Sequence, residues 1–298
     1  MQPDAEGQLR AWVEYYRELG VYDFYRSEGQ ATAAEPTDEP GALESVQARV
    51  PAPIEVQPGQ KAPSAATPVP RSAPQASPAG PTPADMATRL VSFDKLAPVS
   101  ADIVPDAQRA AALQIIRDEI GDCTRCPLAY AGRKQIVFAD GSPTARLMFV
   151  GEGPGADEDT QGLPFVGKAG QLLNNMIGAM GLERRDVYIA NIVKCRPPSN
   201  RVPEPIEANT CSQFLLRQID IVRPQVIVAL GSTAATYLLG VKQSLSALRG
   251  RWHTCRGAKL AVTYHPAFLL RDPRQKGEAW KDLQMVMTEM GLKPPARK

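Results

Sequence analysis

The sequence predicts an α/β protein, a three-layer α/β/α sandwich around a short, mainly parallel sheet of four strands. Nearly continuous apolar runs are typical of strands that are buried on both faces of a parallel sheet. Such runs occupy residues 146–150, 187–193, 226–230 and 260–263. Segments with the apolar spacing of helices follow these runs, at residues 169–180, 205–222, 233–239 and 278–290. This alternation predicts helices on both faces of the sheet.

The first 84 residues differ from the rest of the chain. Leu9, Trp12, Val13, Tyr16 and Leu19 recur at helical spacing, so residues 1–30 should hold a short amphipathic helix. This helix could pack on its own protein or dock on a protein partner. Residues 31–84 contain 12 prolines and many Ala, Ser and Thr residues, which predicts a disordered linker and favours docking. The folded domain should span residues 85–298.

Charge and composition narrow the class of protein. Residues 1–84 carry 6 Lys/Arg against 11 Asp/Glu, so the formal charge of +2 conceals a basic body that suits nucleic-acid binding. No apolar run is long enough for a membrane span, and the N-terminus lacks a secretory pattern. We therefore expect a cytoplasmic, nucleoid-associated monomer that does not bind membranes.

A glycine-rich segment follows the first predicted strand, at residues 151–170, and reads GEGPGADEDTQGLPFVGKAG. Its glycines let a ligand approach the backbone closely, as in phosphate-binding turns. Its acids, Glu152 and Glu158 among them, would repel an anion, while Phe165 offers a ring for stacking. The segment therefore suits a flat, neutral, polar ligand such as a nucleobase.

The other strands also end at unusual residues. Asn191 lies near the end of the second strand, Gly231-Ser232 follow the third, and His265-Pro266 follow the fourth. Ligands of open parallel sheets bind outside the carboxyl ends of the strands. We therefore expect these residues to meet at one ligand site.

Four of the five cysteines form a candidate metal site. Cys123 and Cys126 form a C-x-x-C pair, Cys195 follows the second strand, and Cys211 lies in a helix. Four thiolates can hold zinc or an iron–sulfur cluster, and Pro127 hints at the cluster. The sequence around Cys255 predicts a polar turn, and we expect no role for this cysteine.

Three motifs together carry a resemblance to a known family. They are the glycine-rich segment above, N-I-V-K-C-R-P-P after the second strand, and T-Y-H-P-A-F-L-L-R after the fourth. Over residues 110–290 the chain resembles the family 4 uracil-DNA glycosylases. The resemblance implies a 4Fe–4S cluster on the four cysteines, with zinc as the alternative, and removal of uracil from DNA in base excision repair.

The resemblance also implies roles for the pocket residues. Phe165 would stack on a uracil that has been flipped out of the DNA. Asn191 would pair with its O4 and N3–H, and His265 would donate to O2 as the departing base gains negative charge. Phe165 and Asn191 each have a simpler explanation, Phe165 as a core residue and Asn191 as a turn former.

The acids are harder to assign. Gly153, a substrate-binding position, replaces an aspartate that positions water in related glycosylases. We expect Glu158 to polarise water and stabilise the sugar cation, and Glu152 to shape the pocket; the alternative is a solvated acidic loop. With water as the nucleophile, the product is an abasic site in an uncut strand, so the enzyme is monofunctional.

The last motif and nearby arginines should contact DNA. Leu269 or Leu270 would enter the gap left by the flipped base, with Arg271 behind it. Arg249 and Arg251 would bind phosphates. Taken singly, each could be an ordinary surface residue.

Other functions remain to be weighed. The chain could be a non-catalytic nucleic-acid-binding module with a structural metal site, or a zinc-stabilised nucleotide-binding protein. A covalently trapping variant of the family is excluded, because residues 192–211 contain no histidine.

Overall fold

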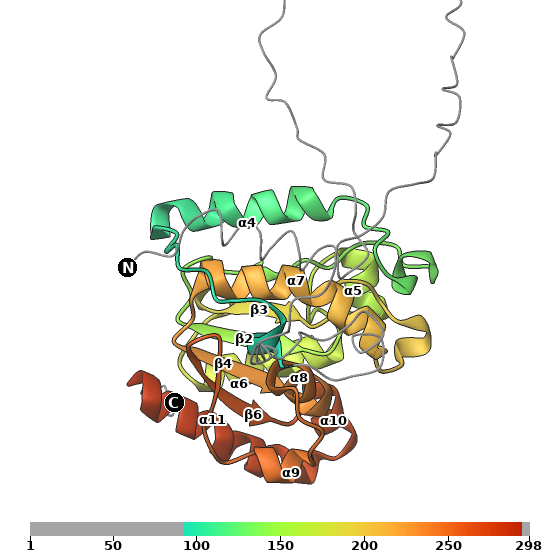
Figure 1. The fold of residues 1–298 in the computed structure, drawn as a ribbon. Helices are drawn as coiled ribbons and strands as arrows, with labels where there is room; N and C mark the ends of the chain where they lie inside the picture. Colours follow the sequence, from blue (N-terminus) through green and yellow to red (C-terminus); the bar gives the residue numbers. More distant parts are fainter. Residues whose placement is uncertain (1–91, 294–298) are drawn as a thin grey trace, which may run out of the picture. The chain divides into compact units, whose positions relative to one another are not determined.

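The computed structural model describes residues 92–293 (Figure 1). The predicted helix within residues 1–30 and the predicted linker at 31–84 lie outside the described residues. Within the described part, no helix is long and apolar enough to cross a membrane.

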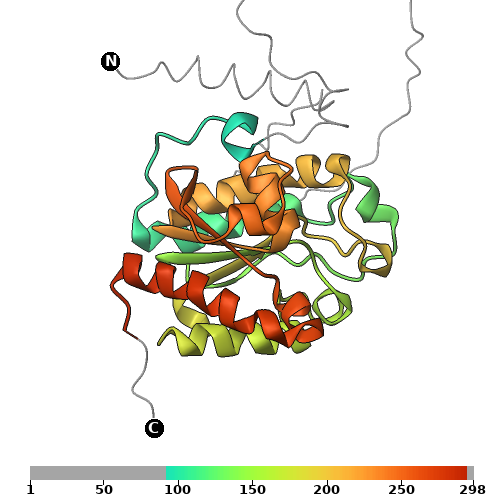
Figure 2. The same cartoon turned by 90° about the horizontal axis from the view of Figure 1, so that it is seen from below.

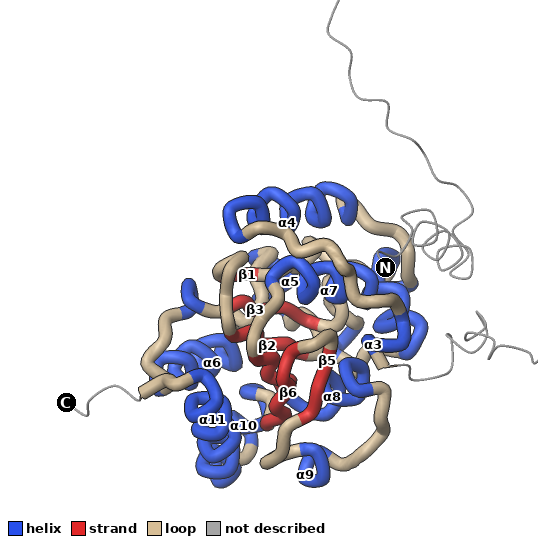
Figure 3. The backbone as a smooth tube through the Cα atoms, turned by 60° about the vertical axis from the view of Figure 1, so that its left-hand side comes forward, coloured by secondary structure: helices blue, strands red, loops and turns tan. Residues whose placement is uncertain are grey.

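A mixed sheet of six strands forms the centre of the fold (Figure 3). Its order is β1-β3-β2-β4-β6-β5. The inner strands are β3 (Tyr188–Asn191), β2 (Leu147–Gly151), β4 (Val226–Leu230) and β6 (Ala258–Thr263), and they pair in parallel. The outer strands, β1 (Asp140–Gly141) and β5 (His253–Cys255), pair antiparallel with β3 and β6.

The expectation of four strands is therefore wrong. The two additional strands are two and three residues long and hold polar residues and glycine, so they carry no apolar run. Cys255 is also not in a polar turn. It is fully buried in β5, and burial raises the pKa of its thiol to about 12.

Helices cover both faces of the sheet. On one side lie α3 (Phe93–Leu96), α4 (Asp106–Ile120), α7 (Pro205–Val222) and α8 (Gly231–Leu239). On the other lie α6 (Lys168–Ala179) and α11 (Lys276–Met290) (Figure 2). Alternate residues of β2 face opposite sides, Met148 and Val150 toward the first group and Leu147 and Phe149 toward the second. A strand buried on both faces is apolar at every position, which is the reason for the continuous runs in the sequence.

Short elements connect the main helices and strands. They are α5 (Ala156–Gln161), α9 (Leu245–Leu248), α10 (Pro266–Arg271) and the 3-10 turns η1 (Pro127–Tyr130), η2 (Arg184–Asp186), η3 (Pro198–Asn200) and η4 (Pro273–Gln275). The register pairs Gly151 with Asn191, and Leu230 with Thr263. The loops after the four inner strands therefore start side by side.

Candidate active site at the carboxyl edge of the sheet

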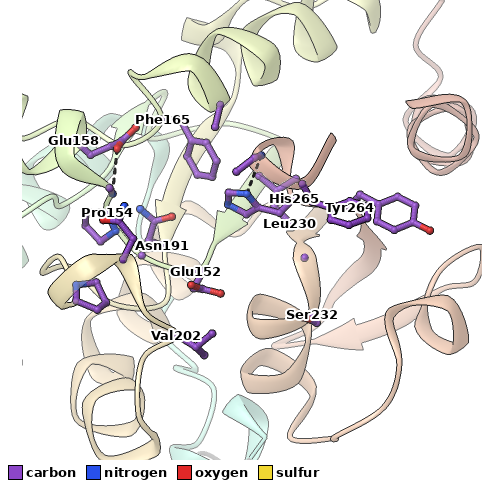
Figure 4. A pocket seen from close by; sticks show the side chains of 18 of the residues that line it. Glu152, Pro154, Glu158, Phe165, Asn191, Val202, Leu230, Ser232, Tyr264 and His265 are labelled. Carbon is purple, nitrogen blue, oxygen red and sulfur yellow. Dashed lines mark hydrogen bonds between the residues drawn. The ribbon is translucent and has the colours of Figure 1, made fainter. Parts of the chain in front are cut away.

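A cavity of about 700 Å³ opens where these loops meet (Figure 4). It brings together most of the residues predicted from sequence. Its lining includes Glu152, Gly153, Glu158, Phe165, Asn191, Ser232, His265 and Arg271. A pocket of this size can enclose a nucleobase and part of its sugar.

Phe165 forms one wall of the pocket. Its side chain is buried and its backbone has a φ of 52°, a left-handed conformation that non-glycine residues rarely adopt. Arg184 holds this conformation by donating to the carbonyl oxygens of Phe165 and Pro164, at 3.1 and 2.6 Å. Strain of this kind persists where surrounding contacts fix it, often at functional sites.

Asn191 presents an unsatisfied amide to the same space. The residue is 2 % exposed, and its Oδ1 has no hydrogen-bond partner among the described residues. A buried acceptor without a partner costs about 1–3 kcal/mol, so such an atom is expected where a ligand completes the bond. Figure 4 shows the amide beside Glu152 and below Phe165.

His265 lies beside Phe165 in the pocket, with 5.5 Å between the ring centroids. Burial, helped by the Arg271 cation and opposed by Glu158, lowers the pKa of His265 to about 4. The ring is therefore neutral at pH 7. Its Nδ1 accepts a hydrogen bond from the Ala267 amide at 3.1 Å, so the single ring proton lies on Nε2, which can donate to a ligand.

Glu158 is held by the backbone of both loops around the pocket. Its Oε1 accepts from the amides of Val166 and Gly167, at 2.9 and 3.2 Å, and its Oε2 accepts from Gly155 at 3.0 Å. The carboxylate thus joins the glycine-rich turn to the loop that carries Phe165. The sequence did not predict this bonding.

Glu152 lines the same pocket as Glu158. Burial raises the pKa of its carboxyl, and a hydrogen bond with Thr233 at the start of α8 opposes the shift. Next to it, a side chain at Gly153 would meet Val193 Cγ2 at 2.8 Å. Gly153 therefore keeps the chain close to the β3 loop, and a larger residue here would require that loop to move.

This pocket can hold a planar base between an aromatic ring, an amide and a neutral imidazole. A profile of the uracil DNA glycosylase superfamily matches residues 138–284. A type-4 uracil-DNA glycosylase of Thermotoga maritima is 46% identical over 168 residues, which cover 55% of this chain and 86% of the relative. The chain belongs to the type-4 uracil-DNA glycosylases.

Two archaeal relatives of the same type agree. The protein of Saccharolobus solfataricus is 42% identical over 61% of this chain and 88% of its own length. The protein of Archaeoglobus fulgidus is 39% identical over 62% of this chain and 96% of its own length. The chain is thus a DNA glycosylase, a hydrolase that acts on N-glycosidic bonds, as the sequence motifs predicted.

The residues expected to contact DNA differ in exposure. Leu269 is 1 % exposed and packs in the core, whereas Leu270 is 43 % exposed. Of the two leucines, only Leu270 is therefore free to enter DNA. Arg251 and Arg271 are exposed.

Arg249 has partners within the glycosylase itself. Its Nε donates to Asp282 at 2.7 Å, its side chain is 10 % exposed, and it covers the Tyr264 ring at 4.2 Å. Because these contacts already occupy its guanidinium, Arg249 is not a free phosphate ligand, contrary to the prediction from the sequence.

The four predicted metal-ligand cysteines of the glycosylase line a second, small pocket between α4 and α7. Burial raises the pKa of the Cys195 thiol to about 11 and that of the Cys211 thiol to about 12. Arg125 donates to Cys123 Sγ at 3.5 Å and Arg133 to Cys195 Sγ at 3.6 Å. Within residues 92–293, no three metal-ligating side chains meet the spacing for a single metal ion.

Sequence reasoning missed several residues of the glycosylase site. Arg184 and Thr233 act through contacts across the fold, which no local pattern shows. Tyr264 lines the pocket beside His265. Lys194 of the N-I-V-K-C motif is not among the predicted site residues, although its position next to Cys195 is a signal.

Proposed function

We propose that this uracil-DNA glycosylase binds a flipped uracil in the 700 Å³ pocket, with Phe165 against the ring and Asn191 and His265 on its polar edges. Asn191 Oδ1 accepts from uracil N3–H, and the amide nitrogen donates to O4. The unpartnered, buried Oδ1 is the observation that carries this proposal. Cytosine offers an acceptor at N3 and a donor at C4, so it would meet the same amide with the wrong pattern.

His265 assists departure of the base. As the glycosidic bond breaks, negative charge develops on uracil O2, and the Nε2–H of the neutral ring donates to it. A donor of this kind contributes about 3–4 kcal/mol to the transition state. The proton stays on His265, because the imidazole acts here as a hydrogen-bond donor.

Glu158 serves the sugar side of the reaction. Its fixed negative charge stabilises the cation that develops on the sugar, and Oε2, which accepts only one amide bond, keeps a lone pair for the attacking water. Glu152 shapes the floor of the pocket. Water adds to the sugar carbon as the glycosidic bond breaks, its proton passes to Glu158 and then to the departing uracil anion, and the product is an abasic site in an uncut strand.

The DNA is held outside the pocket. Leu270 fills the gap left by the flipped nucleotide, and the exposed cations Arg251 and Arg271 bind phosphates. Unstacking the base costs a few kcal/mol, which these contacts offset.

The four cysteines suit a 4Fe–4S cluster. All four thiols line one pocket, and Arg125 and Arg133 donate toward the sulfurs of Cys123 and Cys195. Cys123, Cys126, Cys195 and Cys211 would hold the cluster, which would support the loop after Asn191 by joining their segments. Zinc is the alternative, and metal analysis separates the two.

The sequence supports two further parts of this proposal. The glycosylase acts as a cytoplasmic monomer, and the amphipathic pattern within residues 1–30 serves to bind a protein partner. Deletion of residues 1–84 should therefore leave turnover on short oligonucleotides nearly unchanged.

The test of this function is incubation with an oligonucleotide that contains uracil, followed by alkali. If the enzyme-treated strand breaks only when alkali is added, the protein is a monofunctional glycosylase. Binding without scission shows a non-catalytic module. Asn191→Asp, measured in parallel, should weaken the discrimination between uracil and cytosine. Unchanged discrimination would contradict the amide-reading role.

A further inference from the structure

Lys194 is a buried cation close to the uracil-reading residue. It lies three residues after Asn191, in the connection from β3 to α7, and it is 1 % exposed. No other lysine among residues 92–293 is buried. Burial of a charge is costly unless its donors are fully used, so such a residue requires a specific reason.

The contacts of Lys194 join Asn191 to α7. Its Nζ donates to the carbonyl oxygen of Asn191 at 3.0 Å and to Gln218 Oε1 at 2.6 Å. Gln218 is held in turn, because its Nε2 donates to Tyr188 Oη at 3.1 Å and to the Phe138 carbonyl at 3.3 Å. The fixed side-chain amide of Gln218 thus holds the Lys194 cation, and the cation holds the backbone carbonyl of Asn191.

The backbone of Lys194 makes a second link. Its amide donates to Cys211 Sγ at 3.4 Å, so the same residue touches the cysteine pocket and the end of β3. Asn191 is the last residue of that strand. Its side-chain amide is only two rotatable bonds from the backbone, so a small displacement of the backbone moves the amide by a similar amount.

We propose that Lys194 is a positioning residue that holds the Asn191 amide in register with the flipped base. The proposal rests on the role of Asn191 given above. A displacement of about 1 Å at a group that contacts the substrate can cost roughly 100-fold in rate. Removing the Lys194 donor should therefore slow the chemical step and leave DNA affinity nearly unchanged.

The experiment compares Lys194→Met, which keeps the length of the side chain and removes the donor, with Tyr188→Phe. Tyr188→Phe removes a hydroxyl from the same buried network but leaves Gln218 bonded to the Phe138 carbonyl and does not touch the Asn191 carbonyl, so it is a matched control. Each full-length protein is assayed for iron, for its single-turnover rate on a uracil duplex, and for its Kd toward a duplex with an abasic-site analogue.

We expect Lys194→Met to lower the single-turnover rate by at least about tenfold, with Kd within about threefold of the parent. Tyr188→Phe should stay within about twofold in both. A Lys194→Met rate within about threefold of the parent would overturn the proposal. An equal loss of rate in Tyr188→Phe would also overturn it, because the network would then have only a structural role.

If Lys194→Met does not fold or loses iron, a second variant provides the test. Gln218→Leu keeps the lysine but removes its fixed partner, and a rate loss beyond about threefold supports the proposal while no loss overturns it. Asn191→Asp is measured beside these variants. If it retains full rate and base discrimination, the proposed function fails; if only the Lys194 and Gln218 variants are unaffected, this inference alone fails.

Discussion

A side-chain carbon on Gly151 would lie 2.4 Å from Oδ1 of Asn191. The same carbon would lie 2.5 Å from Cζ of Phe165. The absence of a side chain at the end of β2 therefore lets the Phe165 ring approach the Asn191 amide at the end of β3. Only glycine is compatible with this arrangement.

Gly151→Ala should displace the amide or the ring. We expect a loss of about 100-fold in kcat/KM on uracil-containing DNA and a decrease of about 1–3 kcal/mol in the free energy of unfolding. Gly178→Ala is the control, because its added carbon meets nothing within 4 Å on an exposed turn of α6. It should leave activity unchanged and stabilise the helix by about 0.5–1 kcal/mol. Full activity of Gly151→Ala would show that the close approach is dispensable.

The pKa of His265 sets a pH dependence. Burial lowers it to about 4, below its ordinary value of 6.5. Between these values the unfolded protein binds more protons than the folded one, so this residue's contribution to the free energy of unfolding is lost as pH falls from 6.5 toward 4. Above pH 6.5 the contribution is constant.

Catalysis should follow the folded pKa. The rate should not respond to His265 at pH 6–8 and should fall toward pH 4, where the ring gains a second proton. NMR titration of the ring in the intact protein measures this value directly. A His265 pKa near 6.5 in the folded protein would contradict the buried, neutral ring.

Glu158→Gln should harm catalysis more than Glu152→Gln. Glu158→Gln removes the negative charge beside the sugar. Its NH2 group also faces one of the backbone N–H groups whose hydrogen bonds the carboxylate accepts. We expect a loss of about 100-fold in single-turnover rate for Glu158→Gln. For Glu152→Gln we expect less than about tenfold, because burial already favours the neutral form of this carboxyl. The reverse order would assign the water to Glu152.

The two neighbouring leucines of α10 should give different phenotypes. Leu270→Ala removes an exposed side chain, so stability should change by less than about 0.5 kcal/mol while activity on duplex DNA falls. Leu269→Ala leaves a cavity, so we expect a loss of about 2–5 kcal/mol in the free energy of unfolding. Comparison of duplex with single-stranded substrate isolates the wedge, since a single strand leaves no gap to fill. Equal activity of Leu270→Ala and its parent on duplex DNA would exclude the wedge.

Removal of the metal should destabilise the uracil pocket. We expect iron and acid-labile sulfide in equal amounts, and Cys195→Ser should lose both, with a lower melting temperature. Because Lys194 connects Cys211 to Asn191, loss of the cluster should also lower the single-turnover rate. Zinc in place of iron would identify the alternative metal.

The sequence by itself determined the pattern of the sheet's inner strands and the residues at their ends. Each strand is buried on both faces, so it appears as a local apolar run at residues such as 147–150 and 226–230. Parallel strands end at one edge, so the residues that follow them, Asn191 and His265 among them, had to share a site. The family motifs supplied the chemistry of that site.

Only the tertiary structure decided which partners these residues have. The edge strands β1 and β5, the choice between Leu269 and Leu270, and the position of the His265 proton depend on contacts that no local pattern encodes. Lys194 and Gln218 are 24 residues apart in sequence, yet 2.6 Å separates their bonded atoms. Burial and hydrogen bonding arise when distant segments pack, whereas hydrophobic periodicity reports only whether each residue faces the core.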